Sequence, residues 1–367
     1  MSASHDIRRF SHHRTATVSL AAVAMFIVVL HVVGWGTLLA FIVPHHLGVG
    51  SRAFGIGAGV TAYSLGMRHA FDADHIAAID NTTRKLLGEG QRASSVGFWF
   101  SFGHSSVVFG LAMFIALGMH SLSAHVLDAG SPLRMLTSTV GAIVSSVFLY
   151  SIAILNIAAF YDLCTAFRRM RSGRLDEAQL ERCLQSRGLI SRFLAPLMRI
   201  VRKPGQMYFV GVLFGLGFDT ATEIALLVLT GAGAASGLPW YAILCLPVLF
   251  AAGMLLFDTI DGSFMTLAYG WALAQPIRKI YYNLVVTGLS IGFALIIGTI
   301  EMLGLLGNAF RTHRASGAWL PPLDLNHMGF AIVGLFVATW AVSAAIWKFG
   351  RIEQRWHAAE THDSSPV

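Results

Sequence analysis

The sequence predicts an all-α integral membrane protein with eight transmembrane helices. Of its 367 residues, 55% are hydrophobic and only 12% are charged, whereas a soluble domain usually carries about 25% charged residues. Apolar runs of about 20 residues, the length that crosses a hydrocarbon core of about 30 Å, recur along the chain. These runs are much longer than the strands of a membrane barrel, and a helix satisfies its own backbone hydrogen bonds in lipid. We therefore expect helices throughout.

Each expected span is bounded by changes from apolar to polar sequence. We place the spans at about residues 17–43, 53–80, 95–118, 134–160, 207–230, 239–268, 280–306 and 327–348. The first run follows Arg8, Arg9 and Arg14 and is too long for the core of a signal peptide. We therefore expect it to remain as a transmembrane helix.

One long basic connection at residues 162–206 suggests a four-plus-four organisation. It separates transmembrane helices 1–4, within residues 17–161, from helices 5–8, within residues 207–348, and leaves tails at 1–16 and 349–367. A short similarity between residues 71–77 and 218–225 supports two related halves. Transporters commonly place their sites at the interface of such repeats.

Most cations of the loops and tails fall on one side of the predicted bilayer. They are Arg8, Arg9, Arg14, Arg84, Lys85, Arg92, the basic residues of 162–206, Arg278, Lys279, Lys348, Arg351 and Arg355. Because Lys and Arg concentrate in cytoplasmic loops, we expect both termini to lie in the cytoplasm. We also expect a multi-pass protein of the cytoplasmic (inner) membrane, surrounded by the lipid bilayer. The net charge of +7 then reflects topology. Because the cations form no basic face with stacking aromatics, we expect no nucleic-acid partner.

The densest group of ionisable residues lies in the second span. Such residues cost about 2.5 to 3.5 kcal/mol each on insertion scales and usually mark a transport path. Four candidate metal ligands fall within seven residues, namely His69, Asp72, Asp74 and His75. At about 100° per residue, Asp74 points away from the other three. The helix is therefore either enclosed by protein on all sides or locally unwound around an ion, and which of Asp72 and Asp74 is a direct ligand stays open.

The residue types in this group indicate a divalent first-row metal. Imidazole with carboxylate suits Ni²⁺, Co²⁺ or Zn²⁺, and the lack of thiolate disfavours Cu⁺. The three cysteines show no CxxC spacing, so neither a thiolate zinc site nor a disulfide framework is expected. His31 in the first span and His104 in the third are further candidate ligands. The alternative for each is a hydrogen bond between helices.

Acidic residues of the fifth and sixth spans are candidates for a pathway. They are Asp219, Glu223, Asp258 and Asp261. For the last two, packing between helices is an equal alternative, because small and hydroxyl-bearing residues surround them.

The chain resembles the nickel/cobalt transporter family. His69, Asp74 and His75 match its His-x₄-Asp-His signature, and three further family segments follow in the same order at residues 100–108, 216–223 and 253–262. The resemblance implies an eight-span permease that takes up Ni²⁺ and Co²⁺, with essential metal-handling roles for those three residues. The pairing of Phe71 with His31 resembles members that accept cobalt as well as nickel, which adds Phe71 to the pathway residues.

The expected function is a secondary transporter that imports Ni²⁺ or Co²⁺, and not an enzyme. No Walker motif or phosphate loop is present, so no ATPase subunit is implied, and the metal is a transported ion without any further cofactor. Transport of another divalent metal such as Zn²⁺ or Mn²⁺ is an alternative. A membrane metalloenzyme is disfavoured because its His-rich boxes or His-Glu-x-x-His helix are missing, and a transporter of small solutes has no need of two His and two Asp so close together.

Overall fold

The computed structural model describes residues 3–49, 52–117, 130–171, 201–217, 220–273 and 276–311, together with 332–335, 337–338, 341–342 and 345. The eighth expected span therefore lies largely outside the described residues. The same holds for most of the basic connection at 162–206 and for the C-terminal tail at 349–367.

Helices account for nearly all of the described chain. They are α1 (Ala3–Thr37), α2 (Ile56–Ala70), α3 (Ala73–Gly88), α4 (Val96–Ala116), α6 (Pro132–Arg171), α10 (Met207–Gly215), α11 (Ala221–Ala235), α12 (Trp240–Leu273) and α13 (Pro276–Arg311). A π-helical turn (Leu38–Ile42) and a 3₁₀ turn (Val43–His45) extend α1, and a 3₁₀ turn (Pro204–Gln206) precedes α10. The strands β1 (Gly48–Val49) and β2 (Arg52–Ala53) form a small antiparallel pair.

Within the described residues, five helical segments are long and apolar enough to cross a membrane. They are Leu20–His45, Val96–Ala116, Pro132–Ala158, Trp240–Gly270 and Thr287–Leu306. Large apolar side chains on the first of these segments, including Met25, Val28 and Val32, are exposed, as expected for contact with lipid. The prediction of a helical multi-pass membrane protein is confirmed at this level.

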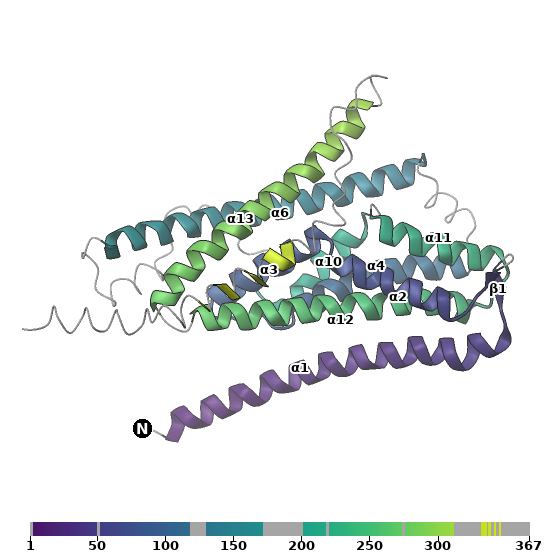
Figure 1. Cartoon of the computed structure of the whole chain (residues 1–367), viewed down its shortest axis with the longest axis horizontal. Helices are drawn as coiled ribbons and strands as arrows, with labels where there is room; N and C mark the ends of the chain where they lie inside the picture. The colour runs from purple at the N-terminus through teal and green to yellow at the C-terminus, as the bar shows by residue number, and fades with distance from the viewer. Residues whose placement is uncertain are drawn as a thin grey trace, which may run out of the picture.

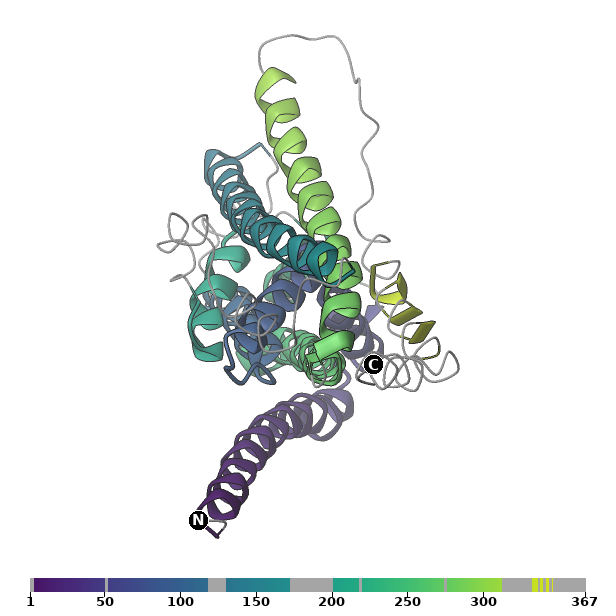
Figure 2. The ribbon, with the colours of Figure 1, turned by 90° about the vertical axis from the view of Figure 1, so that its left-hand side faces the viewer.

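A compact central bundle lies between two outlying parts (Figures 1 and 2). Helices α2, α3, α4, α10, α11 and α12 form the bundle, with α12 packed along α2 and α4 and with α10 packed along α4. Helix α1 contacts the bundle mainly through α12 and diverges from it toward the N-terminus. Helices α6 and α13 pack mainly against each other and cross over the opposite side of the bundle.

The second and fifth expected spans are both broken helices. In the second expected span, α2 ends at Ala70 and α3 begins at Ala73, with Asp72 in an extended conformation (φ −67°, ψ 142°) between them. In the fifth expected span, α10 ends at Gly215 and α11 begins at Ala221, with Thr220 in a similar conformation (φ −84°, ψ 142°). Asp and Thr are residue types favoured at helix N-caps. Local unwinding, one of the two alternatives for span two, is therefore what the structure shows.

Glycines allow the central helices to approach closely. A Cβ on Gly66 of α2 would overlap the carbonyl oxygen of Phe250 on α12, and a Cβ on Gly97 of α4 would overlap the carbonyl oxygen of Asp258 on α12. Such small residues let membrane helices bring their backbones together. The close approach at Gly97 and Asp258 places the acidic residues of α12 directly beside α4.

Candidate metal site

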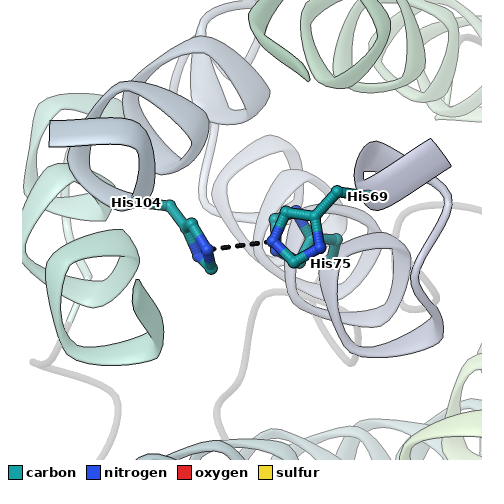
Figure 3. A group of neighbouring side chains, drawn as sticks. All are labelled: His69, His75 and His104. Atoms are coloured by element: carbon teal, nitrogen blue, oxygen red, sulfur yellow. Dashed lines mark hydrogen bonds between the residues drawn. The ribbon is translucent and has the colours of Figure 1, made fainter. Parts of the chain in front are cut away.

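Three histidines from three helices meet in the centre of the bundle. His69 lies in the last turn of α2, His75 in the first turn of α3, and His104 in α4. The break at residues 71–72 lets His69 and His75 approach from two differently placed helices, as Figure 3 shows. All three side chains are buried, with at most 3% of each residue exposed. One ring nitrogen from each lies within 4.8 Å of the others.

Glu223 adds a carboxylate to these imidazoles. Its Oε1 atom lies 2.8 Å from Nε2 of His104 and 4.0 Å from Nε2 of His69. The hydroxyl of Thr220 donates to the other carboxylate oxygen at 2.9 Å, so the extended N-cap residue of α11 orients the acid in that helix's first turn. The sequence favours a pathway role for Glu223, whereas its position beside His104 makes it a candidate ligand.

The side of His69 away from His104 is held by polar groups. Its Nδ1 atom lies 2.7 Å from Oδ2 of Asp72 and 3.0 Å from the hydroxyl of Thr222. The Asp72 side chain makes no capping hydrogen bond to α3, because it turns back to the imidazole. Thr222 was not singled out from the sequence, although its place beside Glu223 in a polar patch of an apolar span was a usable signal.

The other predicted ligands lie in different surroundings. Asp74 accepts a hydrogen bond from the backbone N–H of His75 at 2.9 Å, which suits an acidic residue in a helix's first turn. His31 contacts the carbonyl oxygen of Ile27 at 2.8 Å and the hydroxyl of Tyr63 at 3.2 Å. Neither belongs to the group of converging ring nitrogens found among the described residues.

The pathway residues are spread over several helices. The ring of Phe71 packs beside Phe257, with centroids 5.5 Å apart. Asp258 contacts His75, and Asp261 has one carboxylate oxygen that is buried with no hydrogen-bond partner among the described residues. Asp219 lies outside the described residues.

The spacing of His69 and His104 fits two ligands of one first-row metal ion. Two donors bound at about 2.1 Å stand about 3.0 Å apart at a right angle and about 3.4 Å apart in a tetrahedron. Nε2 of His69 and Nε2 of His104 are 2.9 Å apart, drawn as the dashed line in Figure 3. The three imidazoles, with the carboxylate of Glu223 beside His104, are donor types suited to Ni²⁺, Co²⁺ and Zn²⁺.

The fold and this site define a multi-pass helical membrane protein with a buried, histidine-rich group able to hold a metal ion. Residues 55–346 match the model of a family described as high-affinity nickel-transport protein. The chain belongs to this family of nickel transporters, which confirms the resemblance drawn from its motifs.

Its similarity to individual relatives extends over most of its length. The chain is 55% identical to a nickel transporter of Mycobacterium tuberculosis over 91% of this chain and 90% of the relative. It is 44% identical to a nickel transporter of Staphylococcus aureus, over 90% and 94%. It is 41% identical to a cobalt transport protein of Rhodococcus rhodochrous, over 89% and 92%. No solved structure matches the chain.

Proposed function

We propose that this protein is a permease that imports Ni²⁺, Co²⁺ or both across the cytoplasmic membrane through eight transmembrane helices, with both termini in the cytoplasm. The observation that carries the proposal is the convergence of His69, His75 and His104 inside an apolar bundle. The names of the relatives, which include both nickel and cobalt transporters, support these two ions over Zn²⁺ and Mn²⁺. The same names support a transporter over a metalloenzyme.

The binding step uses residues from both broken helices. The ion sheds water and binds the Nε2 atoms of the three histidines together with Glu223, in a site that other protein groups shield from lipid. Asp72 holds His69 from behind and need not contact the metal. The ion then leaves inward past acidic residues such as Asp261 of α12.

The membrane potential supplies enough energy for uptake. Moving a divalent cation inward releases about 4.6 kcal/mol per 100 mV, at about 2.3 kcal/mol for each charge. At about 1.4 kcal/mol per factor of ten, this corresponds to a concentration ratio of roughly a thousand. A coupled proton is therefore unnecessary.

Uptake of labelled metal tests the proposal. Cells producing wild type should accumulate radiolabelled Ni²⁺ or Co²⁺, and His69→Ala at equal membrane abundance should not. His45→Ala is the matched control, because His45 is exposed and contacts the carbonyl oxygen of Phe41 in its own helical segment. Uptake by His69→Ala at the wild-type rate would refute the proposal.

Counterflow in proteoliposomes identifies the transported ion. Vesicles loaded with unlabelled Ni²⁺ or Co²⁺ should exchange it for external labelled metal, and excess external Zn²⁺ or Mn²⁺ should compete weakly. Strong exchange of Zn²⁺ or Mn²⁺ in preference to both other ions would instead support the alternative substrates.

A further inference from the structure

The ring of His75 is held by a carboxylate from a helix distant in the sequence. Its ring is fully buried, and Nδ1 lies 3.2 Å from Oδ2 of Asp258 on α12. Its other nitrogen, Nε2, is buried and has no hydrogen-bond partner among the described residues. By contrast, His69 receives its carboxylate from Asp72, three residues further along the chain.

The contact with Asp258 selects one form of the imidazole. An ionised carboxylate only accepts hydrogen bonds, so the proton of a neutral His75 resides on Nδ1. Nε2 then carries the lone pair that can bind a metal. A histidine that binds a metal through one ring nitrogen commonly donates the N–H of its other ring nitrogen to a carboxylate. This hydrogen bond fixes the ring and strengthens the ligand.

Asp258 is itself held by a second helix. The hydroxyl of Ser101 on α4 donates to the same carboxylate oxygen at 2.8 Å. Ser101 lies one turn before His104, and Gly97, a further turn back, allows α4 to approach the backbone of Asp258. A series of side-chain contacts thus joins α4, α12 and α3 beside the site, from Ser101 through Asp258 to His75.

We propose that Asp258, oriented by Ser101, is a positioning residue that presents Nε2 of His75 to the transported metal. The inference rests on the proposed function and makes it more specific. Asp258 then acts behind the ligand His75, and not as the pathway residue that the sequence favours. Loss of such a supporting group commonly lowers metal affinity by about 10- to 100-fold.

Metal binding by purified protein in lipid nanodiscs tests this role. The probe is Co²⁺, whose visible absorption reports the number and arrangement of its ligands, with affinity measured by titration. Asp258→Asn keeps the shape of the side chain but removes its charge. We expect it to weaken Co²⁺ binding by about 10- to 100-fold and to alter the absorption spectrum, and we expect Ser101→Ala to shift both in the same direction by less.

Glu301→Gln is the matched control. Glu301 of α13 also accepts hydrogen bonds from serine hydroxyls, those of Ser145 at 2.9 Å and Ser146 at 3.1 Å, so the change has the same chemistry away from the three histidines. This variant should bind Co²⁺ as wild type does. An equal loss in Glu301→Gln would show that removing another serine-bonded acid of the helices has the same effect, and would overturn the specific role of Asp258.

The remaining outcomes separate the two proposals. Wild-type affinity and spectrum in Asp258→Asn, with uptake lost, would make Asp258 a pathway residue and overturn the inference. If Asp258→Asn is not recovered as folded protein, Ser101→Ala decides, and an unchanged spectrum and affinity in that variant overturns the inference. Failure of wild type itself to bind Co²⁺ or Ni²⁺ would count against the proposed function instead.

Discussion

Nε2 of His69 on α2 and Nε2 of His104 on α4 lie 2.9 Å apart in the buried centre of the bundle. Two ring nitrogens at this distance share at most one proton between them, or are bridged by a cation. The pair is therefore a sensitive place to test for metal.

Nickel should stabilise the folded protein through this pair. A ligand that binds only the folded state adds about 2.7 kcal/mol at 100 times its dissociation constant, so the melting temperature in detergent should rise with Ni²⁺ concentration. In His104→Ala the rise should be largely lost because one of three imidazoles is missing. Mg²⁺, which prefers oxygen ligands, is the control ion. Equal stabilisation of variant and wild type by Ni²⁺ would exclude His104 as a ligand.

Glu223→Gln should weaken uptake while leaving the protein folded. The amide keeps the volume of the side chain but removes the charge next to Nε2 of His104, so we expect the KM for Ni²⁺ to rise at least about tenfold, by analogy with other losses around metal sites. Glu89→Gln, at the half-buried C-terminal end of α3, serves for comparison. An unchanged KM in Glu223→Gln would remove this carboxylate from the binding step.

Gly97→Ala should destabilise the contact between α4 and α12. The added methyl group would overlap the carbonyl oxygen of Asp258, and inserting a carbon into a tightly packed core typically costs about 1–3 kcal/mol. Gly110→Ala on the same helix meets nothing within 4 Å. Thermal unfolding of the two variants in one detergent should therefore differ, and equal melting temperatures would contradict the close approach.

Tyr269→Phe should lower stability without abolishing uptake. The Tyr269 hydroxyl donates to one oxygen of Asp80, and Ser290 donates to the other at 2.7 Å, all in buried surroundings that join α3, α12 and α13. A buried acceptor left unsatisfied costs about 1–3 kcal/mol. Tyr150→Phe, whose hydroxyl bonds to Thr299 at an exposed position, should have a smaller effect. Uptake per folded molecule should stay near that of wild type, and its complete loss would place Asp80 in the transport step.

Part of the candidate site was accessible to sequence reasoning because its residues are close together in the chain. His69 and His75 are six positions apart, and their cost in an apolar span marked them as functional. The spacing on a regular helix also separated Asp74 from the others, and in the structure Asp74 bonds to the backbone of His75. The break between α2 and α3 was one of two alternatives, since helical periodicity cannot distinguish an enclosed helix from an unwound one.

The sequence by itself determined that this chain is a helical membrane protein of a nickel-transporter family with a histidine-rich second span. Composition decides the first point, because in lipid a helix is the economical way to satisfy the polar backbone of an apolar segment. Short motifs decide the second. Only the tertiary structure decided which atoms meet. His69 and His104 are 35 residues apart, and His104 and Glu223 are 119 apart. Whether such groups touch depends on how α2, α4 and α11 pack, and no local pattern encodes that packing.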